Sequence, residues 1–114
     1  MIAHGDVVWV DFGTPRGSEP AKLRPAIVVQ QDWLLATEIS TVLVIPLTSN
    51  LGLEAFPGNV RIPAIASGLE RDSVALVTQL GPVSREFVNT FPVGSVPQFL
   101  IKRIADGVRL VSGL

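Results

Sequence analysis

The residues best suited to bind a phosphate gather in one segment near the N-terminus. Between residues 16 and 24 the sequence carries three cations and one carboxylate, although the net charge of the 114-residue chain is only −1. Such a local excess of positive charge favours an anionic ligand, but a surface loop also carries charges merely for solubility. The residues concerned are Arg16, Ser18, Glu19, Lys22 and Arg24.

The sequence lacks the residues that most other kinds of catalytic site require. The chain has no cysteine and a single histidine, His4, which excludes thiolate nucleophiles, disulfides and a ribonuclease built on two imidazoles. We expect His4 to be a solvated residue of a frayed N-terminus. The sequence has no Gly-rich phosphate loop, no G-x-S-x-G elbow and no His/Asp/Glu cluster with metal-ligand spacing. We therefore expect neither a metal ion nor another cofactor.

The composition is that of one folded domain spanning residues 1–114. Hydrophobic residues make up 47% of the chain and charged residues 17%, which is typical of a globular protein with a buried subunit interface. No apolar run approaches the roughly 20 residues of a membrane helix, and no signal peptide opens the chain, so we expect a cytoplasmic protein without membrane contact. The small net charge means that any nucleic-acid site must be local.

The sequence predicts short β-strands joined by turns. The first covers residues 6–12, DVVWVDF, where β-branched and aromatic residues lie between Gly5 and Gly13. Residues 13–25 are predicted as a surface loop, because prolines and glycines interrupt any hydrophobic period. Further strands are predicted at residues 26–30, 41–48, 59–63 and 72–80. No gap between them suits a parallel crossover, so the sheet should be mostly antiparallel.

Two kinds of residue in these segments carry more specific predictions. Pro46 has no N–H to donate to a neighbouring strand, so its end of the strand should lie at an edge or a bulge. Trp9 and Trp33 could stack on nucleic-acid bases. Because Trp9 belongs to an apolar strand, we expect it to pack in the core instead.

The end of the chain is predicted to be helical. Ser95, Pro97 and Gln98 fit a capping box with proline just inside the helix, and apolar residues recur at helical spacing from Pro97 to Val111. We expect an amphipathic helix that is interrupted by Gly107. The whole pattern is mainly β with a C-terminal α-helix, and it predicts a small, strongly curved antiparallel sheet or partly open barrel closed by that helix.

Four blocks of the sequence resemble the successive signature blocks of the MazF/PemK toxin family. They are GDVVWVDFG, RGSEPAKLRPAIVVQ, IPLTSN and GLERDSVALVTQL, in the family's order and at similar separations, from residue 4 to about residue 83. The resemblance implies an SH3-like barrel with a C-terminal helix, the CcdB/MazF-like fold. It also implies a homodimeric endoribonuclease toxin, an mRNA interferase, with a groove for single-stranded RNA across the interface. Its expected partner is an antitoxin of the MazE type whose acidic tail fills this groove.

The resemblance further implies the chemistry and its residues. Members of the family cleave RNA when the 2′-hydroxyl attacks the adjacent phosphorus, so the protein need only position the reactants, move protons and stabilise charge. Arg24 in LRPAIVV matches the catalytic arginine, whose planar fork suits phosphate oxygens, and Thr48 in IPLTSN matches the catalytic threonine. Glu19 is expected to act as the general base or to accept hydrogen bonds from the RNA, unless it is a solvated loop acid. The residues expected to bind RNA are Arg16, Ser18, Lys22, Asp72 and Gln79.

Several alternatives stay open at this point. Asp72 and Ser73 could simply fix the turn into a strand, and Thr48 could be a strand-end hydroxyl in a turn. The chain could also be a CcdB-like toxin that binds a topoisomerase and cuts nothing, or an inactive member that only binds an antitoxin, because fold alone does not decide function.

Overall fold

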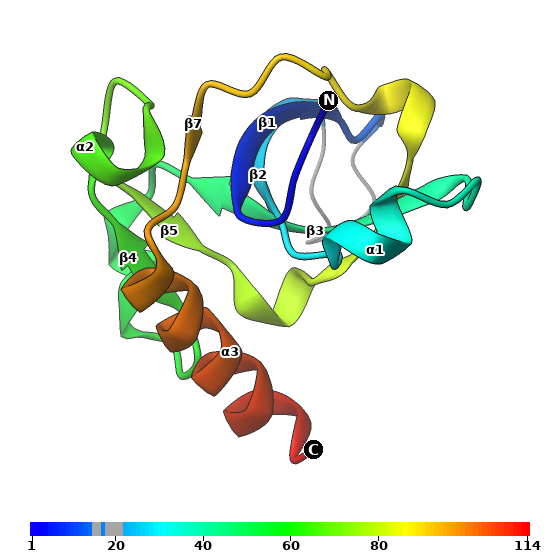
Figure 1. Cartoon of the computed structure of the whole chain (residues 1–114). Coiled ribbons are helices and arrows are strands. Elements are labelled where there is room, and N and C mark those ends of the chain that lie inside the picture. Colours follow the sequence, from blue (N-terminus) through cyan, green and yellow to red (C-terminus); the bar gives the residue numbers. More distant parts are fainter. Residues whose placement is uncertain (15–16, 18–21) are drawn as a thin grey trace.

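The computed structural model describes residues 1–14, 17 and 22–114 (Figure 1). Its strands are β1 (Asp6–Asp11), β2 (Leu23–Val28), β3 (Thr41–Thr48), β4 (Val60–Ile62), β5 (Ser73–Ala75), β6 (Gly81–Ser84) and β7 (Gly94–Ser95). Its helices are α1 (Asp32–Leu35), α2 (Ala64–Ser67) and α3 (Gln98–Ser112), with 3-10 turns η1 (Leu51–Ala55), η2 (Val77–Gln79) and η3 (Arg85–Phe87).

The strands form one curled antiparallel sheet with the order β4-β5-β3-β2-β1-β7, and β6 also pairs with β3. Every strand pair is antiparallel, as the sequence predicted. Figure 1 shows the sheet curving on itself, with α3 lying against the β4 end and the chain returning through β7 to the edge of β1. The predicted mainly β barrel with a C-terminal helix is therefore confirmed.

Strand β3 lies in the middle of the sheet and changes its partner along its length. Its first half, from Thr41 to Val44, pairs with β6, whereas Leu47 and Thr48 pair with β5. Pro46 falls between these two ladders, and its carbonyl accepts a bond from the Leu76 N–H. Proline is tolerated because no N–H is required where the partner changes. The prediction of an edge or a bulge therefore holds only in part: Pro46 itself pairs with Ala26 inside the sheet, whereas Leu47 and Thr48 beyond it pair with β5 alone.

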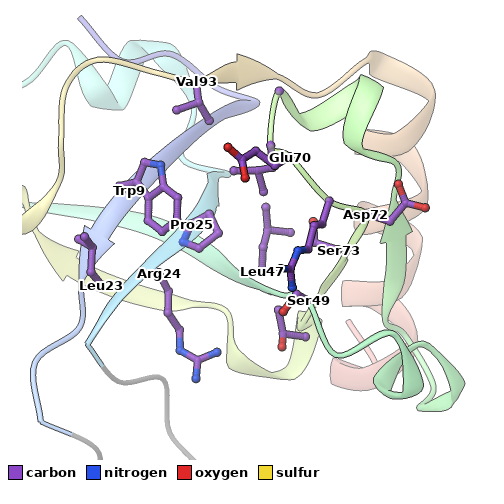
Figure 2. Close-up of a pocket in the computed structure, with 14 residues that line it drawn as sticks. Trp9, Leu23, Arg24, Pro25, Leu47, Ser49, Glu70, Asp72, Ser73 and Val93 are labelled. Carbon is purple, nitrogen blue, oxygen red and sulfur yellow. The ribbon is translucent and has the colours of Figure 1, made fainter.

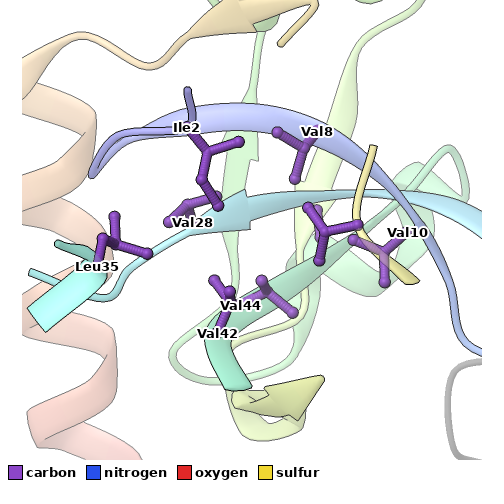
Figure 3. Packing of buried hydrophobic residues seen from close by; sticks show 9 residues of the cluster. Ile2, Val8, Val10, Val28, Leu35, Val42 and Val44 are labelled. Atoms are coloured by element: carbon purple, nitrogen blue, oxygen red, sulfur yellow. The ribbon is translucent and has the colours of Figure 1, made fainter. Parts of the chain in front are cut away.

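The central strands are buried on both faces, which explains their nearly continuous apolar sequences. One face contributes to the inner core, shown in Figure 3, which consists of Ile2, Val8, Val10, Ala26, Val28, Leu35, Val42, Val44 and Val88. The opposite face contributes to the outer core, which consists of Val7, Ile27, Ile45, Leu47, Ile62, Ala75, Val96, Leu100 and Ile104. Neighbouring residues of one strand point to opposite faces, so β1 supplies Val7 to the outer core and Val8 to the inner core.

Helix α3 covers the outer core with Leu100 and Ile104, which are 2% and 3% exposed. The helix runs through Gly107 without a break, so the predicted interruption is wrong. A Cβ at Gly107 would overlap the carbonyl oxygen of Gly58, which means that this glycine allows two backbones to approach. The helix ends at Gly113, whose φ of 74° suits a left-handed cap.

The predicted capping box and two predicted boundaries also differ from the structure. Among the described residues no side chain caps α3, and the Ser95 of the proposed box pairs with Asp6 in the sheet. The predicted loop 13–25 ends earlier, since β2 begins at Leu23. The predicted strand 72–80 ends at Ala75, after which η2 turns the chain. Within the described residues, no helix is long and apolar enough to cross a membrane.

Candidate active site

An open pocket of about 650 Å³ lies where β2 begins and β3 ends, beside the segment that links α2 to β5 (Figure 2). Strands β1, β2 and β3 supply its floor, while residues 68–73 and the chain just before β7 supply its walls. The lining residues are Trp9, Leu23, Arg24, Pro25, Leu47, Thr48, Ser49, Gly68, Leu69, Glu70, Arg71, Asp72, Ser73 and Val93.

The pocket places Arg24 and Thr48 together, as the sequence motifs predicted. The β2–β3 ladder ends at the pair Ala26 and Pro46, and Arg24 and Thr48 lie two residues beyond this pair on their strands, where both line the pocket. Arg24 is partly buried, and Figure 2 shows its side chain pointing away from Trp9 and Pro25. The two predicted catalytic residues therefore share one end of the sheet.

Thr48 is held in place by the turn that follows β3. The side chain is 9% exposed, and its Oγ1 accepts a hydrogen bond of 3.2 Å from the Asn50 N–H. Accepting this bond does not use the hydroxyl proton, so the O–H is still able to donate to an oxygen of a ligand. The strand-end role and the catalytic role of Thr48 are thus compatible.

The floor of the pocket is apolar and continues the face of the outer core. Trp9 lies opposite Pro25 in the β1–β2 ladder, and both point to the same face as Leu47, which is 1% exposed. Trp9 is half-buried and lines the pocket. The expectation that it packs in the core is therefore wrong, because the described part of the chain leaves this end of the sheet face open as a pocket.

Asp72 lines the pocket, but both of its carboxylate oxygens are already bonded. Oδ1 accepts a 2.8 Å bond from the Ala64 N–H, and Oδ2 accepts a 3.0 Å bond from Arg61. The Ala64 N–H is the largest cause that holds the pKa of Asp72 below its ordinary value, followed by the Arg61 bond. The same pair raises the pKa of Arg61. Figure 2 shows the carboxylate directed away from the middle of the pocket, so its visible contacts fix the turn into β5.

Glu70 and Arg71 stand beside Asp72 in the sequence but differ from it in their bonding. Both are exposed, and within the described part of the chain neither side chain forms a hydrogen bond or an ion pair. The resemblance pointed to Asp72 and passed over Glu70. The available signal was a run of three charged residues directly before a buried strand, which reads equally well as a solvated turn.

Gln79 and Lys22, the other predicted RNA-binding residues that the structure describes, do not line this pocket. Gln79 lies on η2 and lines a second pocket of about 570 Å³ that includes Asp11, Phe12 and Ser84. Lys22 is exposed in the left-handed region, with a φ of 61°. Its backbone bonds Phe12 and Gly13 at the end of the β1–β2 pair. Arg16, Ser18 and Glu19 lie outside the described residues.

His4 is not the frayed residue that the sequence suggested. It is half-buried, its backbone N–H donates to Asp32 at 2.8 Å, and its Nδ1 lies 3.2 Å from the Val29 carbonyl oxygen. It lies outside the pocket that contains Arg24 and Thr48. The described residues also contain no group of three or more His, Asp or Glu side chains that could hold a metal ion.

The pocket therefore combines a cation, a hydroxyl donor and an apolar floor in one open hollow. An arginine is able to pair with two phosphate oxygens at once and keeps its charge at every physiological pH. A threonine beside it adds a neutral hydrogen bond to the same group. Such a site suits electrostatic stabilisation of a phosphate whose negative charge grows during a reaction.

Comparison with known proteins identifies a family and similar proteins. A family model described as "PemK-like, MazF-like toxin of type II toxin-antitoxin system" matches residues 3–112. Endoribonuclease MazF6 of Mycobacterium tuberculosis is 40% identical over 114 residues, which cover 100% of this chain and 99% of the relative.

Solved structures share the architecture. The crystal structure of MazF from Deinococcus radiodurans superposes with a TM-score of 0.82 at 19% identity, over 99% of this chain and 97% of that one. An endoribonuclease in complex with its cognate antitoxin, from a mycobacterial species, has a TM-score of 0.78 at 16% identity, over 100% and 97%. At these identities the matches show a shared fold.

Proposed function

This chain belongs to the PemK-like, MazF-like family of toxins of type II toxin–antitoxin systems, and from this membership we infer that it is an endoribonuclease that cleaves single-stranded RNA. The observation that carries the inference is the shared pocket of Arg24 and Thr48 at the ends of two neighbouring strands. A toxin of this kind acts on messenger RNA in the cytoplasm and thereby stops translation and growth.

The proposed reaction uses the nucleophile of the RNA itself. The 2′-oxygen forms a bond to the adjacent phosphorus, the bond from phosphorus to the 5′-oxygen breaks, and the products are a cyclic phosphate and a 5′-hydroxyl. One proton leaves the 2′-hydroxyl and another is delivered to the 5′-oxygen. No metal ion is needed for this step, because the nucleophile is already part of the substrate.

Arg24 and Thr48 have distinct parts in this reaction. The Arg24 guanidinium stabilises the negative charge that develops on the phosphate oxygens, which favours the transition state over the ground state. The Thr48 hydroxyl donates to a phosphate oxygen or orients the 2′-hydroxyl, since its proton is not used by the Asn50 bond. Glu19 is the proposed general base, while Arg16, Ser18, Lys22, Asp72 and Gln79 are proposed to contact the RNA.

The proposed assembly is a homodimer that an antitoxin inhibits. Apolar side chains that are more than a third exposed include Leu43, Leu80 and Phe87. An apolar groove of about 360 Å³ runs along α3. Such surfaces are typical of a subunit interface. The expected inhibitor is a MazE-like antitoxin, whose acidic tail complements the cations of the RNA site.

The decisive experiment incubates end-labelled RNA with the purified chain in excess EDTA. We expect cleavage to persist and the downstream fragment to begin with a 5′-hydroxyl, which polynucleotide kinase labels directly. The Arg24→Ala variant, purified in the same way, controls for a contaminating ribonuclease. A 5′-phosphate product, or loss of cleavage in EDTA, would exclude the mechanism. Intact RNA would favour a topoisomerase-binding toxin or an inactive member.

A further inference from the structure

The apolar floor of the pocket has no part in the proposed cleavage step, yet it is built from large side chains. Trp9 and Pro25 are cross-strand neighbours, and Leu47 lies beside them as a buried residue. Val93 faces them from the opposite wall. An indole that stays half-buried in an open pocket offers a flat surface on which a second ring could stack.

One carboxylate of the pocket is available to recognise a ligand. Among the residues that the structure describes, Glu70 has no hydrogen-bond or ion-pair partner, whereas the oxygens of Asp72 are both occupied. Figure 2 shows the Glu70 carboxylate directed towards Trp9 and Val93, on the side away from Asp72. An acceptor with two oxygens therefore lies at the rim of an aromatic floor.

This combination matches an unpaired nucleobase that carries N–H donors. Proteins read single-stranded RNA by stacking splayed bases on aromatic rings and by hydrogen bonding to their Watson–Crick edges. A carboxylate accepts from the amino group of a base. Guanine fits best, because its N1–H and N2–H lie side by side and would meet both oxygens, as in other bidentate charge-assisted pairs. Uracil fits worst, because carbonyl oxygens flank its only N–H.

We propose that this pocket is a base-recognition subsite in which Trp9 and Pro25 stack a base and the Glu70 carboxylate accepts its N–H donors, with guanine preferred over uracil. The proposal rests on the proposed RNA substrate. Arg24 lies on the neighbouring part of the same pocket, so the bound base would belong to a nucleotide close to the phosphate that is cleaved. Glu70 then selects the sequence that is cut, without taking part in the bond rearrangement.

The test observes Trp9 directly by NMR. The chain has two tryptophans, so its ¹H–¹⁵N spectrum has two indole signals, and Trp33→Phe identifies the signal of Trp9. We expect 5′-GMP to shift the Trp9 signal with a dissociation constant about tenfold below that of 5′-UMP, which corresponds to about 1.4 kcal/mol. 5′-CMP and 5′-AMP should fall between them. All four nucleotides carry the same phosphate, so the ratio reports on the base.

Glu70→Gln isolates the carboxylate, because the amide keeps its shape and loses one acceptor and the charge. We expect the dissociation constants of GMP and UMP to come within about twofold of each other. The Trp9 signal should still shift when either nucleotide binds. Glu86→Gln makes the same charge change at an exposed carboxylate outside the pocket, and it should keep the tenfold ratio. Equal affinity of the parent for GMP and UMP, or an unchanged ratio in Glu70→Gln, would overturn the proposal.

Cleavage of a random RNA pool by the same proteins separates this proposal from the proposed function. Glu70→Gln should relax the base preference at one position of the cleavage motif, whereas Glu86→Gln, outside the pocket, should keep both this preference and the single-turnover rate of the parent. Cleavage by the parent without any response of Trp9 to nucleotides would sink the base subsite and leave the ribonuclease intact. A Trp9 response to an apolar peptide but to no nucleotide would assign the pocket to a protein partner and overturn the subsite.

Discussion

One face of the sheet contributes to the outer core at one end and to the candidate active site at the other. At one end Val7 lies opposite Ile27, and Leu100 of α3 covers them in the outer core. Two residues further along the same strands, Trp9 lies opposite Pro25 on the same face, and there the pocket is open. Side chains alternate with a period of two, so both pairs have the same orientation. The sheet is therefore the same at both ends. The site differs from the core because α3 covers only one end of this sheet face.

Substitutions at the covered end should reduce the stability of the protein most. Leu100→Ala removes a buried side chain between α3 and the sheet, and we expect the free energy of unfolding to fall by about 3 kcal/mol. Leu110→Ala on the same helix is the matched control, because Leu110 is 67% exposed, and it should change stability by less than about 0.5 kcal/mol. Urea denaturation followed by circular dichroism measures both. Equal losses would contradict the assignment of the outer core.

The open end should lose activity and keep its stability. Arg24→Ala is expected to reduce the single-turnover rate of RNA cleavage about a hundredfold, or about 2.7 kcal/mol in the transition state, because one charge-stabilising group is lost. Arg24→Lys should restore the rate only in part, since an ammonium lacks the planar fork. Lys22→Gln, outside the pocket that holds Arg24, should mainly weaken RNA binding and its dependence on salt. A folded Arg24→Ala protein that cleaves within a fewfold of the parent would exclude the proposed site.

The close approach of α3 to the chain before β4 gives a third expectation. A helical glycine replaced by alanine ordinarily gains about 1 kcal/mol of stability. Gly107→Ala should instead lose about 2 kcal/mol, because the new Cβ would overlap the Gly58 carbonyl oxygen. Thermal unfolding measures the sign, with Leu110→Ala as the reference on the exposed face. A stabilised Gly107→Ala protein would show that α3 moves away from Gly58 without a loss of stability.

The smallest expected effect concerns Asp72 at the rim of the pocket. Its pKa is lowered in the folded protein, first by the Ala64 N–H and then by Arg61, so the unfolded chain binds a proton more readily. Its contribution is therefore fully present above the ordinary aspartate pKa of about 3.9 and is lost as the pH falls through the lower folded value. Asp72→Asn should be less stable than the parent at pH 6, and the difference should shrink towards pH 2. A difference that grows on acidification would reverse the assignment.

The sequence was most informative where a segment depends on its own pattern. Strand β1 and helix α3 were predicted because β-branched residues and helical spacing are local properties. Strands β6 and β7 were missed because they are short and are fixed by distant partners, as Gly94 is by Val7. The uninterrupted course of α3 through Gly107 could not be read either, because its reason is the backbone of a segment about 50 residues away.

The candidate site shows the same division. Arg24 and Thr48 were predicted from short motifs, and in the structure both line one pocket. The exposed carboxylate of Glu70 was missed because a charged turn has no local mark that separates recognition from solvation. Only the fold places residues 68–73 across from Trp9. The bonding of Asp72 to Ala64 likewise depends on a turn that the sequence did not define.

Pro46 has a consequence for the way in which this molecule opens. An amide protected by a ladder exchanges its hydrogen only when that ladder breaks, and neighbouring ladders break with different free energies. Proline has no amide hydrogen, so the two ladders of β3 are joined at a residue that bonds neither β5 nor β6 through an N–H. We expect hydrogen exchange to distinguish Val42 and Val44, paired with β6, from Thr48, paired with β5. The half of β3 that carries Thr48 would then open together with β5, independently of the half that pairs with β6.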